Sequence, residues 1–514
     1  MTSYDAERRV WSGRRVEPLF DPGRSAGDVV MELLRRDPEK PVLIDADSDR
    51  VLTREEVRIR AMRIAQNLRA KFGLLGDNAE EIVTIAALGS ENLIPLTVAL
   101  QCLAVPYNAL YPHYSEGEMV HMMKQTQSRL IFCDDLNYSL VMEAAKKSIK
   151  ENFVIFLLHG SVEGVRSVVE LLEETGVEDE FEPVKVKDTM KAIWCILCSS
   201  GTTGQPKALG SIHWVSVAYS YDLALIYSGV VVFTRKPFSA DLVLDLLEKY
   251  RINALNCQPL YANAVAQHLR AKTADLSSLK LWGIGGYFVS DGVRDAVDAI
   301  LPHGKSYTIY ASTECGLIAS DLLRRKRGAV GTVFPSMQIR IVDDDGVSLG
   351  VGESGELLLR RAIPFAGYFK NEEATRAAFD EDDWFRSGDT GYFDEDGFLY
   401  LGDRKSEGFK YIDHVPPTFL EELIAQVDGV EQVCVIGLPL EDKSGELPTA
   451  VVVRSKEHQV SGETIADYVA ARVRDHMKLR GGVHFVDDLP LTSKGNVKRK
   501  EVKRMIFGKC EQLN

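Results

Sequence analysis

Apolar and polar residues alternate along the first 290 residues in two recurring patterns, one helical and one typical of buried strands. A helix is predicted over 25–36, and the capping box at Thr53 opens a second helix that ends near Gly73. Further strands are predicted at 82–87, 130–133, 153–158, 192–198, 252–257 and 281–287, and helices at 91–103, 116–127, 138–149, 240–250 and 261–269. This alternation predicts parallel sheets covered by helices on both faces, with ligands at the carboxyl ends of the strands.

The pattern changes after residue 330. Residues 330–357 alternate with a period of two between turn residues, which predicts a small antiparallel β-barrel. Strands at 433–438 and 449–454 and a helix at 464–477 follow in the last part of the chain. At 514 residues the chain is too long for one core. We therefore predict two domains of α/β class, with the parallel sheets and the barrel in 1–403 and a small α+β domain in 404–514.

Composition and charge narrow the class of protein. Apolar residues make up 45% and charged residues 26%, as in ordinary globular enzymes. The net charge of −14 argues against a nucleic-acid partner. Polar interruptions at Glu91 and Asn92 argue against a transmembrane segment in the richest apolar stretch, 82–111. The charged N-terminus lacks a signal peptide, and most of the 8 cysteines sit in apolar runs as free thiols do in a reducing compartment, so we expect a cytoplasmic protein.

A loop rich in glycine and hydroxyl groups follows the predicted strand 192–198. Gly201 and Gly204 allow the backbone N–H groups to face a ligand, and Lys207 adds a mobile positive charge. The spacing to Lys207 is not that of a Walker A loop. A cradle for a polyphosphate is one interpretation, and a plain connection between strands is the other. The candidate phosphate-binding residues are Ser199, Ser200, Gly201, Thr202, Thr203 and Gly204.

This loop resembles the phosphate-binding motif of the adenylate-forming superfamily, which includes acyl-CoA synthetases, 4-coumarate–CoA ligases and beetle luciferases. Further motifs occur in the family's order over nearly the whole chain. The segment 310–314 resembles the family's Tyr-Gly-x-Thr-Glu, and the segments 365–375, 384–392 and 402–404 have counterparts as well. The segments 445–448 and 478–482 are very close to beetle luciferases and their acyl-CoA synthetase relatives.

The resemblance implies a binding site for ATP and AMP with Mg²⁺. Tyr310 would stack on adenine, Thr313 would contact phosphate, Glu314 would bind the metal ion, and Asp389 would accept both ribose hydroxyls. Arg404 would contact the ribose, while Gly285, Gly286 and Ala311 would lie beside the nucleotide. His213 and Tyr287 are assigned to the acid-binding pocket, and a core-packing role remains the alternative for Tyr287.

The chain departs from the family at several positions. A strand-and-helix unit that normally follows His213 is missing, so we infer a deletion before 228–233. The hinge position of the C-terminal domain holds Ser406 where Asp or Lys is usual. In the family, the lysine at the position of Lys410 faces the site once this domain has rotated. The glycine pair that usually follows this lysine is absent. Asn496 stands where the family has a lysine that bridges the carboxylate and the α-phosphate during adenylation.

Three functions remain open. The first is an ATP-dependent acyl-CoA synthetase that activates a fatty or aryl acid and transfers it to CoA, with Lys207, Lys410 and position 496 as catalytic positions. The second is a nucleotide- or acyl-binding homologue that has lost adenylation at Asn496. The third is a luciferase-like monooxygenase. Peroxisomal residence is common in the family, but the C-terminus is not Ser-Lys-Leu. The sequence fixes neither the acid nor the oligomeric state.

Overall fold

The first two predicted helices begin and end where their capping residues lie. The computed structural model describes residues 2–76, 81–112, 114–189, 192–198, 208–209, 221, 224–286, 289–343, 345–363, 365–404, 409–411, 413–415, 417–440, 446–455, 460–473, 475–491 and 497–510. Helix α1 (Ala26–Arg35) is capped by the Ser25 hydroxyl, and the capping box predicted at Thr53 opens α2 (Arg54–Phe72). Gly73 ends α2 with a φ of 65°, a conformation that favours glycine.

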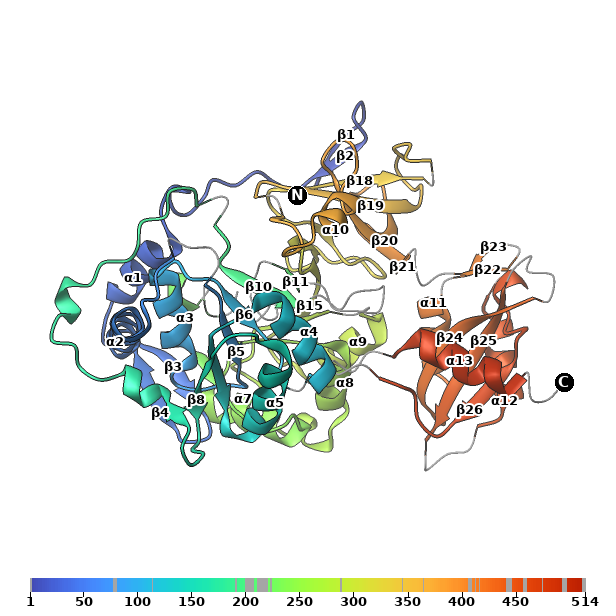
Figure 1. The fold of residues 1–514 in the computed structure, drawn as a ribbon. Coiled ribbons are helices and arrows are strands. Elements are labelled where there is room, and N and C mark those ends of the chain that lie inside the picture. The colour runs from blue at the N-terminus through green and yellow to red at the C-terminus, as the bar shows by residue number, and fades with distance from the viewer. Residues whose placement is uncertain are drawn as a thin grey trace.

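A seven-stranded sheet forms the first layer of the larger part of the molecule, in the order β11-β10-β6-β5-β7-β8-β9 (Figure 1). All neighbouring strands are parallel except β10 and β11. Its strands are β5 (Val83–Ala86), β6 (Tyr107–Ala109), β7 (Leu130–Asp134), β8 (Val154–His159), β9 (Arg166–Ser167), β10 (Cys195–Cys198) and β11 (Ala208–Leu209). Its helices are α3 (Leu93–Cys102), α4 (Glu116–Thr126) and α5 (Tyr138–Ser148).

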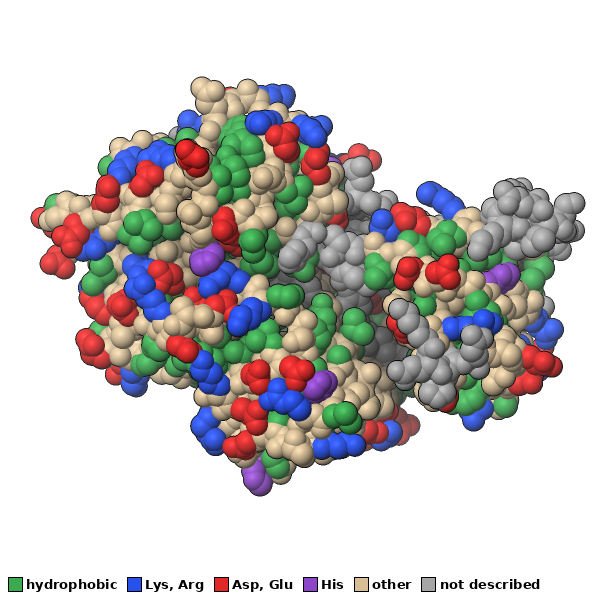
Figure 2. Space-filling model, turned by 90° about the horizontal axis from the view of Figure 1, so that it is seen from below, with side chains coloured by type: hydrophobic (Ala, Val, Ile, Leu, Met, Phe, Trp, Pro, Cys, Tyr) green, Lys and Arg blue, Asp and Glu red, His purple; other side chains and the backbone are tan. Residues whose placement is uncertain are grey.

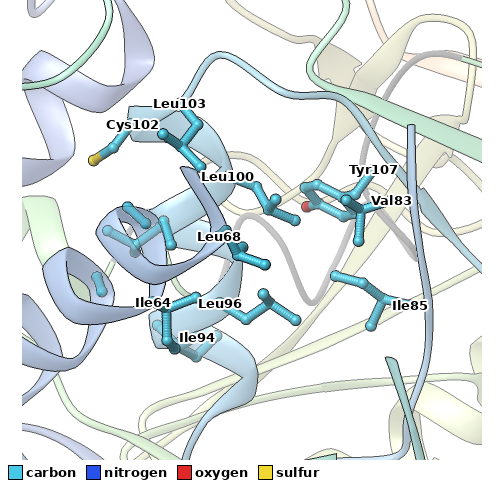
Figure 3. Close-up of a cluster of buried hydrophobic side chains, with 14 of the residues drawn as sticks. Ile64, Leu68, Val83, Ile85, Ile94, Leu96, Leu100, Cys102, Leu103 and Tyr107 are labelled. Carbon is cyan, nitrogen blue, oxygen red and sulfur yellow. The ribbon is translucent and has the colours of Figure 1, made fainter. Parts of the chain in front are cut away.

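Helices cover both faces of this sheet, as the alternation predicts. Phe132 of β7 packs into a core cluster with residues of α2 and α3, whereas its neighbours Ile131 and Cys133 pack into a second cluster with residues of α4 and α5. Figure 3 shows the first cluster, where Leu68 of α2 and Leu100 of α3 lie between their helices and the sheet. Since consecutive side chains of a strand point to opposite faces, a run of apolar residues is what two covered faces require.

Two further sheets belong to the larger part of the molecule. A three-stranded sheet has the order β12-β3-β4, and a five-stranded sheet has the order β13-β14-β15-β16-β17. The strands are β3 (Pro41–Asp45), β4 (Arg50–Thr53), β12 (Val231–Phe233), β13 (Ala254–Cys257), β14 (Leu281–Gly285), β15 (Lys305–Ser312), β16 (Gly316–Ser320) and β17 (Thr332–Val333). The helices are α7 (Ala240–Tyr250), α8 (Pro259–Gln267) and α9 (Asp291–Ile300).

The connection β12–α7–β13 joins two strands that belong to different sheets. Each is the last strand of its sheet, and no described strand pairs with the outer edge of β12 or β13. Strands joined by a single helix usually share one sheet. This break follows directly on the place where the sequence predicts a missing strand-and-helix unit, after His213.

The six-stranded antiparallel sheet confirms the predicted small barrel as a half-barrel, with the order β1-β2-β18-β19-β20-β21. Its strands are β1 (Ser3–Asp5), β2 (Val10–Ser12), β18 (Met337–Val342), β19 (Gly355–Arg361), β20 (Phe385–Phe393) and β21 (Leu399–Arg404), and α10 (Glu372–Ala377) lies beside it. Two of these strands come from the N-terminus, where Trp11 stacks on Phe393 with ring centroids 4.4 Å apart. This hairpin was not predicted from the sequence.

The C-terminal part forms a separate smaller body in Figure 1. It contains the hairpin β22 (Phe409–Tyr411) and β23 (Asp413–Val415), and a sheet of β24 (Val430–Pro439), β25 (Glu446–Arg454) and β26 (Val483–Val486) with α11 (Pro417–Ala425), α12 (Gly462–Ala470) and α13 (Arg499–Cys510). The helix predicted over 464–477 is too long, because α12 ends at Ala470. The Arg472 side chain donates to the Tyr468 carbonyl oxygen at 3.0 Å and so satisfies a carbonyl of the last turn.

The charged side chains on the surface and the buried cysteines agree with the prediction of a globular enzyme. Acidic and basic side chains are interspersed over the face shown in Figure 2. Among the described cysteines, Cys102 and Cys133 are buried free thiols as predicted, Cys434 is buried, and Cys257 is only partly buried. Burial raises the pKa of Cys102 and of Cys133 to about 12, so both stay protonated. No helix in the described part of the chain is long and apolar enough to cross a membrane.

Asp134 is a buried carboxylate at the carboxyl end of β7. One oxygen accepts the Leu88 N–H at 2.7 Å, and the other has no hydrogen-bond partner among the residues that the structure describes. Burial raises the pKa of Asp134 to about 6, against the lowering effects of the Leu88 N–H, His159 and Arg235. Because the folded protein holds this proton more tightly than the unfolded chain does, Asp134 makes the protein progressively less stable as the pH rises from about 4 to about 6.

An Asp134→Asn variant is expected to lose this pH dependence. The free energy of unfolding of the variant, relative to that of the wild type, is expected to increase by about 2–3 kcal/mol between pH 4 and pH 7.5. Urea unfolding at the two pH values measures this difference. As a control, Ser90→Ala removes a neutral hydrogen bond to Leu158 at the same sheet edge. Its effect should be equal at both pH values, and an equal effect of Asp134→Asn at both would contradict the prediction.

Candidate functional site

The candidate site lies at the carboxyl ends of β14 and β15. Gly285 ends β14, and a Cβ atom there would lie 2.5 Å from the Ile309 carbonyl oxygen of β15, so only glycine allows the two strands this close approach. Gly286 follows with a φ of 87°, a conformation that favours glycine. Both predicted glycines therefore stand where the backbone requires them.

Strand β15 carries Tyr310 and Ala311 at its end and continues into a tight turn. The Ser312 hydroxyl accepts the Cys315 N–H at 3.0 Å and holds this turn closed, before β16 returns antiparallel to β15. The register of the two strands shifts between Tyr310 and Ala311. Thr313 and Glu314 lie in the turn and are half-buried, so the structure places the four predicted residues of this motif at one sheet end.

Tyr310 contacts the carboxylate predicted for the ribose. Its phenol donates a hydrogen bond to an Asp389 carboxylate oxygen at 2.5 Å. Asp389 lies in β20, where the Ser387 hydroxyl accepts its N–H at 3.1 Å and Gly388 adopts a φ of 73°. In the half-barrel, Asp389 pairs in register with Arg404 of β21. Residues from the parallel sheet and from the half-barrel thus meet at one place.

Glu314 has a partner that the sequence analysis did not assign. The Tyr368 phenol donates to a Glu314 carboxylate oxygen at 3.2 Å. Burial and the nearby Glu314 raise the pKa of Tyr368, so this side chain is a neutral donor. The only sequence signal for Tyr368 was its place in the family-like segment 365–375.

Several predicted site residues lie outside the described residues. Lys410 is described as part of the β22 backbone, where it pairs in register with His414. The side chain of Arg404 is likewise outside the description. The predicted residues whose positions lie wholly outside it are Ser199, Ser200, Gly201, Thr202, Thr203, Gly204, Lys207, His213, Tyr287, Ser406 and Asn496.

Family models match most of the chain. The model of the AMP-binding enzyme family matches residues 31–213 and 208–369. The model of the AMP-binding enzyme C-terminal domain matches residues 420–496. The two segments of the first match overlap at 208–213, directly before the deletion that is inferred after His213.

Similar proteins cover the chain almost end to end. Luciferin 4-monooxygenase from Photinus pyralis is 29% identical over 95% of this chain and 96% of its own. 4-Coumarate–CoA ligase 1 from Arabidopsis thaliana is 26% identical over 93% of this chain and 92% of its own. Among solved structures, ATP-bound MatB from Rhodopseudomonas palustris superposes with a TM-score of 0.80 at 23% identity, over 93% of this chain and 98% of its own. The likeness to this structure shows the same fold.

Proposed function

Because the chain belongs to the AMP-binding enzyme family, in the adenylate-forming superfamily that its motifs resemble, we propose that it is an AMP-forming acid–thiol ligase. The observation that carries this proposal is the hydrogen bond from Tyr310 to Asp389. The resemblance assigns these residues to adenine and ribose, and they lie 79 residues apart in the sequence. Their contact supports a nucleotide site between the end of β15 and the half-barrel.

The proposed reaction has two steps. A carboxylate oxygen of the acid attacks the α-phosphorus of ATP, and the bond to the bridging oxygen of the β-phosphate breaks to release pyrophosphate. The thiolate of CoA then attacks the acyl carbon and AMP leaves. Lys207 would neutralise the phosphates. Rotation of domain 404–514 against domain 1–403 about Ser406 would bring Lys410 to the site and separate the two steps.

The donor set near β15 fits Mg²⁺ shared with a nucleotide. Proteins usually hold Mg²⁺ through one or two carboxylates together with substrate phosphates. Glu314 supplies one such carboxylate, and the described residues contain no group of three or more His, Cys, Asp or Glu that could hold a metal ion by themselves. When bound, the ion would supply positive charge against the phosphates.

We further propose a fatty or aryl acid as substrate, with His213 and Tyr287 in its pocket. One similar protein is named a 4-coumarate–CoA ligase, and a protein of the same fold was solved as an anthranilate CoA ligase with anthranoyl-AMP. These names support an aryl acid. The inferred deletion after His213 affects the same pocket, so the acid is best identified by a panel.

Pyrophosphate release tests the proposed function. Wild-type protein is incubated with ATP, Mg²⁺ and a panel of fatty and aryl acids, with and without CoA. We expect acid-dependent release of pyrophosphate, and formation of the acyl-CoA when CoA is present. Asp389→Ala, which removes the carboxylate next to Tyr310, is expected to abolish release. Release that is independent of any acid would contradict a ligase.

Asn496 favours a second candidate, a nucleotide- or acyl-binding homologue that no longer forms an adenylate. An asparagine can donate a hydrogen bond but brings no positive charge to the reacting carboxylate and phosphate. Equilibrium binding of ATP without pyrophosphate release for any acid would favour this candidate over the ligase.

A further inference from the structure

The Tyr368 phenol reaches Glu314 from a segment far away in the sequence. Tyr368 lies between β19 and α10, 54 residues after Glu314, and its Oη atom is 3.2 Å from Glu314 Oε1. Glu314 is the carboxylate that the proposed function assigns to Mg²⁺. Within the described residues this contact engages Oε1, and Oε2 is the second oxygen through which the carboxylate can bind another partner.

The position of the Tyr368 backbone is fixed by α10. The Thr375 hydroxyl accepts the Tyr368 N–H at 2.8 Å and donates to the Asn371 carbonyl oxygen at 2.8 Å. The Asn371 side chain in turn caps α10 by accepting the Ala374 N–H at 2.9 Å. Gly367 has a φ of 102°, and a Cβ there would lie 2.8 Å from the Thr375 methyl group. The chain before α10 thus has one well-determined path.

The Tyr368 ring is fixed as well. It packs edge to face on Phe365, with ring centroids 5.1 Å apart. Phe365 in turn packs on Phe385 of β20 with centroids 5.7 Å apart. A half-buried phenol held on both its backbone and its ring has little freedom to move its hydroxyl group. Its hydroxyl group donates to Glu314 at 3.2 Å.

We propose that Tyr368 is a positioning residue for Glu314, which holds the carboxylate in the orientation that binds the divalent metal ion of a metal–nucleotide complex. Partners that hydrogen-bond to a metal-binding carboxylate fix its orientation, and their loss typically weakens metal affinity by about 10–100-fold. The inference rests on the proposed function, since it takes Glu314 as the metal ligand. It adds a residue for which the family resemblance implied no role.

The test compares binding of ATP with and without a metal ion, using Tyr368→Phe. This substitution keeps the ring on Phe365 and removes only the hydroxyl group. Mn²⁺ is used in place of Mg²⁺ because electron paramagnetic resonance measures the concentration of free Mn²⁺. We expect the Kd of Mn²⁺–ATP to rise by about 10–100-fold. The Kd of ATP in the presence of EDTA should change by less than about twofold, which is the size of effect that an ordinary surface substitution can have.

Two further variants separate the possible outcomes. Glu314→Gln should weaken Mn²⁺–ATP binding at least as much as Tyr368→Phe does. Tyr392→Phe removes a phenol hydroxyl from a ring stacked on Tyr400 in the same half-barrel, and should leave metal binding unchanged. Normal Mn²⁺–ATP binding by Tyr368→Phe, or equal weakening with and without metal, would overturn the inference. Failure of the wild type to bind ATP in either condition would contradict the proposed function itself.

Discussion

An Asn496→Lys variant is expected to release pyrophosphate about 10²–10³ times faster than the wild-type protein. The family resemblance implies a lysine at this position, where it would bridge the acid and the α-phosphate. A fixed positive charge aimed at the charge that develops in the transition state is what asparagine cannot supply. The measurement is the initial rate of pyrophosphate release with ATP, Mg²⁺ and the best acid of the panel.

The control for this variant is Asn496→Gln, which changes the side-chain length without adding a charge and should leave the rate near that of the wild type. Lys498 is the described lysine closest in sequence, and it forms an ion pair with Glu501 at 3.3 Å. Lys498→Ala is expected to leave the wild-type rate unchanged. A large loss in Lys498→Ala, with no gain in Asn496→Lys, would show that a neighbouring lysine performs this role.

Breaking the buried ion pair between Arg294 and Asp321 is expected to destabilise the protein by about 3–5 kcal/mol. Arg294 of α9 donates to Asp321, and their side chains are 2% and 0% exposed. Asp321 also accepts the Thr308 N–H of β15 at 2.6 Å. Each single substitution, Arg294→Met or Asp321→Asn, leaves the remaining partner buried without the opposite charge that it pairs with. The midpoint of urea unfolding measures the loss of stability.

The double variant Arg294→Met/Asp321→Asn is expected to recover most of this stability, to within about 1–2 kcal/mol of the wild type. Burial raises the pKa of Asp321 in spite of the adjacent Arg294, so the desolvation of the carboxylate outweighs its pairing. The carbonyl oxygen of the introduced asparagine would still accept the Thr308 N–H. Additive losses in the two single variants and the double variant would contradict a coupled pair. Because Thr308 lies two residues before Tyr310, the single variants should also weaken ATP binding.

Local signals in the sequence predicted the parallel layer well. The Thr53 capping box and Gly73 set both ends of α2, because each depends on residues within one turn of the helix. The apolar runs at β5, β7 and β8 were found because both faces of their sheet are covered. In the site, Tyr310 and Asp389 were predicted from motifs, and the structure brings them into contact.

Features that depend on distant parts of the chain were not predicted. The N-terminal strands β1 and β2 are three residues long each, too short for a clear alternation, and they form on the half-barrel through Trp11 and Phe393. The contact of Tyr368 with Glu314 spans 54 residues, and the pair of Arg294 and Asp321 spans 27. No local pattern carries such pairings, because the fold alone decides which side chains share a buried space.

The separation of β12 from β13 has a consequence for the protein at high concentration. An edge strand presents a row of N–H and C=O groups that can pair with any extended chain, and proteins usually protect such edges with charged residues, proline or a bulge. The four residues of β13 include no charge and no proline, and Ala254 and Asn256 are exposed. This strand is therefore a point from which intermolecular sheet growth, and with it aggregation, is expected to start.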